Sequence, residues 1–214
     1  MATRLLLLDC DSTLSAVEGI DELGRLRGPE VFAQVERMTA EAMDGGIPLE
    51  TVFARRLDLI RPSRAEVDSI AAKYLATAEP DAPEALRRVR AAGWTVAIVS
   101  GGFTEAILPL ARSLGIDHVH AVGLRFDAAG NYAGFDESAP TARSRGKNAV
   151  ARRLRAELGA DEVVMVGDGA SDLEVKGDAD RVIGFGRYAV RAKVKAGADA
   201  FITRLADLPP LLGV

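Results

Sequence analysis

The sequence predicts an α/β protein in which a doubly wound parallel sheet forms the core and a helical cap is inserted after the first strand. Short apolar runs alternate with segments of helical period over much of the chain, which is typical of a parallel sheet flanked by helices. Residues 14–77 break this alternation, because they contain helical patterns and no convincing strand. The chain has 214 residues, 48% hydrophobic and 27% charged, as in ordinary globular proteins.

The expected core consists of residues 1–13 and 78–214, and its predicted strands are short apolar runs suited to burial. These runs lie at 5–8, 94–99, 163–166, 182–185 and 200–202. Helical segments lie at 83–93, 104–115 and 147–159, with closing glycines typical of helix C-termini. Two strand-like runs around a glycine-containing turn at 121–135 predict a hairpin on the sheet. The four helical patterns of residues 14–77 are expected to form the cap.

Composition excludes several classes of partner. The net charge of −4 lacks the basic surface that a nucleic-acid backbone requires. No apolar run approaches the ~18 residues of a membrane span, and the four leucines after Arg4 are too few for a signal peptide. Cys10 is the sole cysteine, so neither an intrachain disulfide nor a cysteine-based zinc site is expected. We therefore expect a cytoplasmic protein with no nucleic-acid or membrane partner, present as a monomer or homodimer.

Four aspartates follow two of the predicted strands. Asp9 and Asp11 come directly after the first strand, where the period of two points both carboxylates the same way. Asp168 and Asp172 lie in a glycine-containing loop after another strand, so the four acids could converge on the ligand-binding edge of the sheet. Four carboxylates and Lys147 leave a formal charge of −3, which is too repulsive without a cation or protonation. All-oxygen ligation favours a hard divalent ion, and we expect Mg²⁺.

Further residues suit a phosphate. Ser100, Gly101 and Gly102 follow the second long strand, where glycines let backbone amides approach an anion, and Lys147 lies near a helix start. Phosphomonoester hydrolysis needs up to ~10²¹-fold acceleration, so charge neutralisation, positioning and a nucleophile must act together. A carboxylate nucleophile splits the displacement into two steps through an aspartyl phosphate.

Four motifs in order, DxDxT at 9–13, serine with two glycines at 100–102, Lys147 and GDGxxD at 167–172, resemble those of the haloacid dehalogenase superfamily of phosphatases. Their spacing covers nearly the whole chain. The resemblance implies that Asp9 attacks phosphorus and that Asp11 protonates the leaving oxygen and then activates water. It also implies that Ser100, Gly101 and Lys147 bind the transferring phosphate. The implied Mg²⁺ ligands are Asp9, the Asp11 backbone carbonyl and Asp168, with Asp172 in support.

Longer stretches, including DSTLSAVEGIDEL at 11–23 and NYAGFDESAPTA at 131–142, resemble the phosphoserine phosphatases within that superfamily. This implies O-phospho-L-serine as the small-molecule substrate and the last step of serine biosynthesis as the role. Glu18 would pair with the substrate ammonium and Arg56 with its carboxylate, and a zwitterion does need one anion and one cation. The implied substrate-binding set is Glu18, Met43, Gly45, Leu49, Arg56, Ser100, Gly101, Gly102 and Ser171.

The sequence departs from the family pattern at the pocket, where Leu49 replaces a common phenylalanine and Ser171 an asparagine or threonine. Three other interpretations stay open. The chain could be a phosphotransferase to an acceptor alcohol such as homoserine, or a phosphatase for another small phosphomonoester. It could also be a non-catalytic receiver-like module phosphorylated on Asp9, although receivers lack a long helical insertion after the first strand.

Overall fold

Six strands form one parallel sheet in this computed structural model, which describes residues 2–43 and 47–214. The strand order is β3-β2-β1-β6-β7-β8, and every neighbouring pair is parallel. The strands are β1 (Arg4–Leu8), β2 (Trp94–Phe103), β3 (His118–Val122), β6 (Glu162–Gly167), β7 (Arg181–Phe185) and β8 (Ala200–Ile202). The predicted α/β fold with a doubly wound parallel sheet is confirmed.

The central strand β1 explains why its sequence is a leucine run. It pairs with β2 on one side and β6 on the other, so both of its edges are occupied. Leu6 and Leu8 pack into one buried cluster, whereas Leu5 and Leu7 pack into another, as the period of two requires. A strand covered on both faces has no polar side, which accounts for its uninterrupted apolar sequence.

The core helices cover these two faces. Helices α5 (Ala82–Ala91) and α6 (Thr104–Ser113) contribute to the cluster of Leu6 and Leu8, and α7 (Gly146–Leu158) contributes to that of Leu5 and Leu7. Three shorter helices, α8 (Ala170–Leu173), α9 (Ala192–Gly197) and α10 (Leu208–Leu211), complete the C-terminal part. The three helical segments predicted for the core are therefore present, with ends shifted by a few residues.

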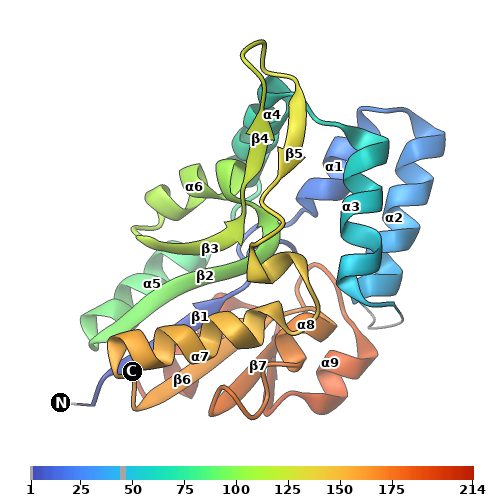
Figure 1. Cartoon of the computed structure of the whole chain (residues 1–214). Helices are drawn as coiled ribbons and strands as arrows, with labels where there is room; N and C mark the ends of the chain where they lie inside the picture. Colours follow the sequence, from blue (N-terminus) through green and yellow to red (C-terminus); the bar gives the residue numbers. More distant parts are fainter. Residues whose placement is uncertain (1, 44–46) are drawn as a thin grey trace.

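The hairpin differs from its prediction. Strands β4 (Leu124–Phe126) and β5 (Tyr132–Phe135) form a separate antiparallel pair that projects from the main sheet (Figure 1). The run at 121–126 is divided at Gly123, because Val122 still pairs with Phe103 of β2 whereas Leu124 pairs with Phe135. The prediction of a hairpin on the sheet is thus wrong. The hairpin instead contacts the helical region of residues 14–77, where the Arg64 amide donates to the Gly130 carbonyl at 2.9 Å.

Four helices lie between β1 and α5, and the structure describes no named strand among them. They are α1 (Gly19–Arg25), α2 (Pro29–Met43), α3 (Leu49–Ile60) and α4 (Arg64–Ala76). Helices α1 to α3 stand together on one side of the hairpin (Figure 1). The chain enters and leaves this region through adjacent segments, since Ser15 and Ala78 form an antiparallel bridge and the Glu79 amide donates to the Leu14 carbonyl at 2.8 Å.

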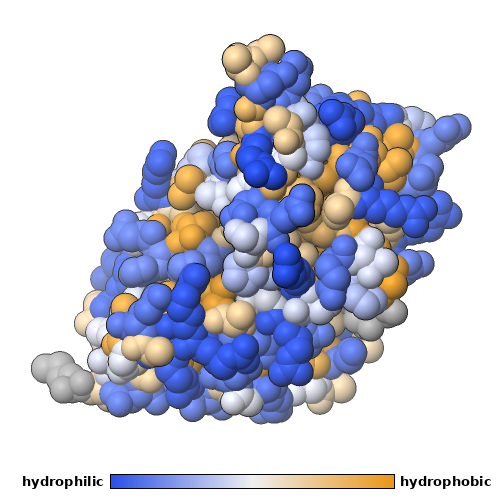
Figure 2. Space-filling view, viewed as in Figure 1, coloured by the Kyte–Doolittle hydropathy of each residue, from blue (hydrophilic) through white to orange (hydrophobic). Residues whose placement is uncertain are grey.

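Hydrophilic residues cover most of the face in Figure 2, with apolar residues in small groups between them. Within the described ranges 2–43 and 47–214, no helix has the length and apolar character needed to cross a membrane.

Candidate active site

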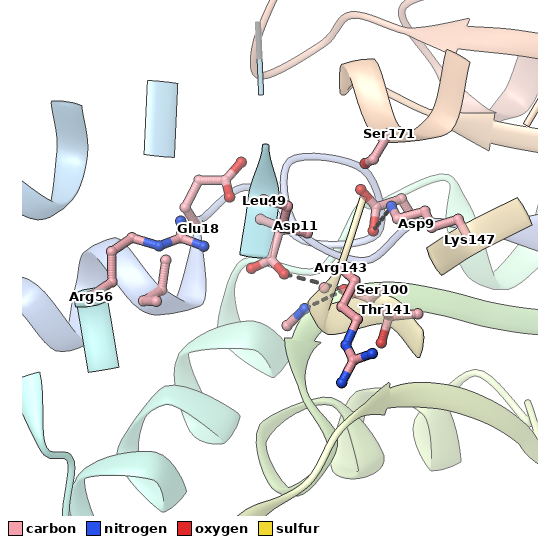
Figure 3. A pocket seen from close by; sticks show the side chains of 13 residues that line it. Asp9, Asp11, Glu18, Leu49, Arg56, Ser100, Thr141, Arg143, Lys147 and Ser171 are labelled. Atoms are coloured by element: carbon pink, nitrogen blue, oxygen red, sulfur yellow. Dashed lines mark hydrogen bonds and ion pairs between the residues drawn. The ribbon is translucent and has the colours of Figure 1, made fainter. Parts of the chain in front are cut away.

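One cavity at the carboxyl edge of the sheet brings most of the predicted site residues together. Its lining comes from the ends of β1 and β2, the start of α7, and helices α1, α3 and α8. The predicted residues that line it are Asp9, Asp11, Glu18, Leu49, Arg56, Ser100, Gly101, Gly102, Lys147 and Ser171. Figure 3 shows Glu18 and Arg56 on one side, Asp9, Lys147 and Ser171 on the other, and Asp11 between them.

Asp9 is held at the end of β1 by an ion pair. Its Oδ1 atom lies 2.9 Å from Lys147 Nζ and accepts a hydrogen bond from the Cys10 amide at 2.8 Å. Lys147 Nζ also donates to Asp172 Oδ1 at 2.6 Å. Burial disfavours the charged ammonium, but Asp172 and Asp9 outweigh it and raise the pKa of Lys147 above its usual value. Lys147 is therefore a fixed cation next to the Asp9 carboxylate.

Asp9, Asp168 and Asp172 form a buried acidic cluster in which one carboxylate oxygen from each lies within 4.8 Å of the others. Burial, together with the charge on Asp9, raises the pKa of Asp168 to about 7 and that of Asp172 to about 8. Carboxylates so placed need either protons or a cation. All donors in the cluster are hard oxygen atoms, so the cluster fits a hard divalent ion better than a soft one.

The Asp11 carboxylate is oriented by two donors. Its Oδ1 atom accepts from the Gly19 amide at 2.7 Å and from the Tyr74 hydroxyl at 2.5 Å, and Oδ2 lies 3.4 Å from Ser100 Oγ. Burial and the nearby Asp9 charge raise the pKa of Asp11 to about 6, against the lowering effect of Tyr74 and Gly19. A carboxyl group with a pKa near neutrality can both give and take a proton.

The last residues of β2 leave no room for side chains beside Asp11. A Cβ atom on Gly102 would lie 2.6 Å from Asp11 Oδ2, so glycine is required for this close approach. The Gly102 amide donates to Ser100 Oγ at 2.9 Å, which orients the serine hydroxyl. Together with Gly101, which lines the cavity, this end of β2 forms a small polar wall of the kind that accepts an anion.

The opposite side of the cavity carries one acid and one base. Glu18 Oε1 accepts from Ser12 Oγ at 2.7 Å, and burial raises the pKa of Glu18 well above its usual value. Arg56 is only 2% exposed, and its guanidinium donates from one terminal nitrogen to Thr39 Oγ1 at 3.0 Å. The Arg56 Nε atom is buried with no hydrogen-bond partner among the described residues. A buried guanidinium with unused donors is suited to an anionic ligand group.

The other predicted residues are placed as follows. Leu49, at the start of α3, faces Gly101, and Ser171 lies in α8. Asp168 follows β6 and accepts from Arg191 Nε at 3.1 Å. Met43 ends α2, and Gly45 lies outside the described residues.

Sequence reasoning missed several residues at this site. Ile20, Thr141 and Arg143 line the cavity, whereas Tyr74 and Thr39 contact predicted site residues from behind. Thr39 carried a usable signal, because it is a polar residue four positions after Val35 on the buried side of α2. Tyr74 carried none, since a tyrosine on an amphipathic helix is ordinary core.

Comparisons with known proteins agree with this geometry. The model of the haloacid dehalogenase-like hydrolases matches residues 6–175. A phosphoserine phosphatase from Bos taurus is 40% identical over 202 residues, which cover 94% of this chain and 89% of the relative. A solved phospho-aspartyl intermediate analogue of phosphoserine phosphatase is similar with a TM-score of 0.86 and 28% identity, covering 99% of both chains. A substrate-bound phosphoserine phosphatase complex gives a TM-score of 0.84 and 28% identity, over 100% of this chain and 98% of that one.

Proposed function

The chain belongs to the haloacid dehalogenase-like hydrolase family, and from this we propose that it hydrolyses O-phospho-L-serine to L-serine and phosphate. One observation carries the proposal: a single cavity is lined by Asp9, Lys147 and Asp11 at one end and by Glu18 and Arg56 at the other. The first group suits a phosphate and the second suits an amino-acid zwitterion. The 40% identity to a phosphoserine phosphatase over most of both chains supports the same substrate.

In the proposed reaction, Asp9 attacks phosphorus through a carboxylate oxygen, and the bond from phosphorus to the serine oxygen breaks. Asp11 donates a proton to that leaving oxygen, so that serine departs as a neutral alcohol. Asp11 then accepts a proton from a water molecule that attacks the aspartyl phosphate, which regenerates Asp9 and releases phosphate. The pKa of Asp11, raised to about 6, supports both transfers near neutral pH.

The phosphate end is proposed to combine fixed donors with a divalent cation. Ser100, Gly101 and Gly102 would hold the transferring phosphate together with Lys147. Mg²⁺, when bound, would neutralise charge on the phosphate, and its proposed ligands are the Asp9 carboxylate, the Asp11 backbone carbonyl and Asp168, with Asp172 in support. The buried acidic cluster and its all-oxygen donor set support this assignment.

The amino-acid end is proposed to confer specificity, with residues 14–77 acting as the cap. Glu18 would bind the substrate ammonium and Arg56 its carboxylate, with Leu49 and Ser171 at the wall of the cavity. Met43 and Gly45 belong to the same proposed set. Closure of the cap would exclude bulk water from the aspartyl phosphate. A place at the last step of serine biosynthesis, in the cytoplasm, completes the proposal.

The test is a phosphate-release screen over phosphoserine, phosphothreonine, phosphoethanolamine and sugar phosphates with Mg²⁺ present. We expect the highest kcat/KM with phosphoserine. Equal values for phosphoserine and phosphoethanolamine, which lacks the carboxylate, would contradict the assignment of Glu18 and Arg56. Adding homoserine as an acceptor and analysing products distinguishes a hydrolase from a phosphotransferase, since only the latter yields a phosphorylated acceptor.

A further inference from the structure

Thr39 links three helices through a single hydroxyl group. Its Oγ1 atom lies 2.6 Å from Asp21 Oδ1 and 3.0 Å from a terminal nitrogen of Arg56. Asp21 belongs to α1, Thr39 to α2 and Arg56 to α3. Thr39 is only 3% exposed, so water does not readily replace either contact.

The direction of each hydrogen bond follows from the groups involved. A guanidinium can only donate, so Thr39 Oγ1 accepts from Arg56 and its own proton must go elsewhere. Two acceptors are within reach, Asp21 Oδ1 at 2.6 Å and the Val35 carbonyl at 3.0 Å. The shorter contact to a charged acceptor is the stronger one. The hydroxyl therefore forms a relay from Arg56 to the Asp21 carboxylate.

This relay supplies a directional contact to the Arg56 side chain, which also lies over the Phe53 ring. The Thr39 hydroxyl is the hydrogen-bond acceptor identified for Arg56 within the described parts of the chain, while Arg56 Nε lacks a partner there. Asp21 also offsets part of the burial that disfavours the Arg56 charge, and it is the largest of the favourable charge interactions on Arg56. One hydroxyl thus fixes where the guanidinium points, and one carboxylate supports its charge.

We propose that Thr39 and Asp21 are positioning residues that hold the Arg56 guanidinium toward the cavity and so determine the preference for a substrate with a carboxylate. This inference rests on the proposed function, because it concerns the residue assigned to the carboxylate of phosphoserine. Neither Thr39 nor Asp21 lines the cavity. Their effect on turnover therefore passes through Arg56.

The experiment compares Thr39→Val, which keeps the shape but removes the hydroxyl, with Thr39→Ser, which keeps the hydroxyl. We expect Thr39→Val to lower kcat/KM for phosphoserine about tenfold, mainly through KM, as for loss of a charge-assisted hydrogen bond. The value for phosphoethanolamine should change less than about twofold, because that substrate offers Arg56 no carboxylate. Thr39→Ser should restore most of the phosphoserine value. An equal loss on both substrates, or no recovery with serine, would overturn the inference.

Two controls separate positioning from general damage. Thr51→Val places the same change on an exposed position of α3 and should leave both kcat/KM values unchanged. In an Arg56→Ala background, Thr39→Val should cause no further loss with phosphoserine, whereas additive losses would exclude action through Arg56. A wild-type enzyme that fails to hydrolyse phosphoserine would refute the proposed function itself. An active, phosphoserine-selective wild type with an indifferent Thr39→Val variant would refute the relay alone.

Discussion

Asp9 is the residue on which the proposed chemistry depends most directly, because its carboxylate would bond to phosphorus. We predict that Asp9→Asn lowers phosphate release from phosphoserine by more than about 10³-fold, since an amide is a poor nucleophile. Asparagine keeps the shape of the side chain, and Lys147 keeps its 2.6 Å contact with Asp172. The thermal unfolding midpoint should therefore stay close to that of the wild type. A folded variant with wild-type turnover would exclude Asp9 as the nucleophile.

Tyr74 controls the proton affinity of Asp11. Its hydroxyl donates to Asp11 Oδ1 and stabilises the carboxylate, which offsets part of the rise in pKa caused by burial and Asp9 and leaves the pKa of Asp11 at about 6. Removing this donor in Tyr74→Phe should raise the pKa further. Activity that needs Asp11 as a base is lost as pH falls through this pKa, so the rising limb of the kcat profile should move to higher pH. Steady-state rates between pH 5 and about 8 measure the shift.

Tyr132→Phe provides the matched control for this pH profile. Tyr132 lies on the hairpin and contacts Arg61, away from Asp11, so its loss should leave the limb in place. A Tyr74→Phe limb that stays fixed or moves to lower pH would show that the phenol does not set the proton affinity of Asp11.

The sequence indicated most of the residues that line the cavity, but it did not indicate how the residues behind them hold those side chains in place. The acids at 9 and 11 follow a strand, and the family resemblance indicated Glu18 and Arg56, all of which line the cavity. Tyr74 and Thr39 were not predicted. The position of Thr39 on the buried side of α2 was a usable signal, but the sequence pattern does not show which residues its hydroxyl, or that of Tyr74, would contact. Such contacts depend on which helices meet, and that is decided by tertiary structure.

At the scale of the elements, hydrogen bonds join the start of α3 to the loop that precedes α7. Ser144 Oγ donates to Glu50 Oε2 at 2.6 Å and accepts from the Leu49 amide at 3.2 Å, and the Ser144 amide donates to the same carboxylate oxygen at 2.8 Å. If the cap opens and closes, these hydrogen bonds to Ser144 must break and re-form. They join the cavity wall at Leu49 to the loop that leads to Lys147.

We predict that Ser144→Ala raises the KM for phosphoserine about twofold to fivefold, with little change in the unfolding midpoint, because exposed hydrogen bonds contribute little to global stability. Ser138→Ala is the matched control, since the Ser138 side chain bonds only to Asp136 within its own loop in the contacts described. Initial-rate kinetics on both variants make the comparison. A Ser144→Ala variant with the wild-type KM would mean that the contact has no part in closing the cavity.

The secondary-structure elements differ in how completely their positions in the fold could be predicted from the sequence. The buried strands were predictable, because a strand covered on both faces is a continuous apolar run, which can be recognised without knowing which strands it pairs with. The hairpin was predicted as a turn with two strands but assigned to the wrong sheet. Its placement depends on the division at Gly123 and on the contact of Gly130 with α4, which are long-range features.

For the molecule as a whole, the two chain segments that join the core to residues 14–77 run side by side at Ser15 and Ala78. The buried cluster nevertheless continues from Leu6 and Leu8 into Phe53, Leu57 and Tyr74 without a break. The helical region therefore shares one hydrophobic core with the sheet. Any motion of this region relative to the sheet must keep these buried contacts or rearrange them. Sequence patterning alone separated the two regions but did not indicate this shared packing.

The buried acids give the whole chain a pH-dependent stability that a divalent cation should reverse. The raised pKa values of Asp168 and Asp172, about 7 and about 8, mean that the folded state without a cation binds protons more tightly than the unfolded chain, where aspartate titrates near ~3.9. This contribution is complete below the unfolded pKa and is lost as pH rises through 7 to 8. Without a cation, the protein should therefore be less stable at pH 9 than at pH 6.5.

A thermal denaturation series at pH 6.5 and pH 9, with EDTA or with Mg²⁺, measures this effect. We expect Mg²⁺ to raise the unfolding midpoint more at pH 9, because fewer protons then compete for the same carboxylates. Asp168→Asn should weaken both the pH dependence and the gain from Mg²⁺. A stabilisation by Mg²⁺ that is equal at the two pH values would contradict binding at the acidic cluster, because binding there must displace protons at the lower pH.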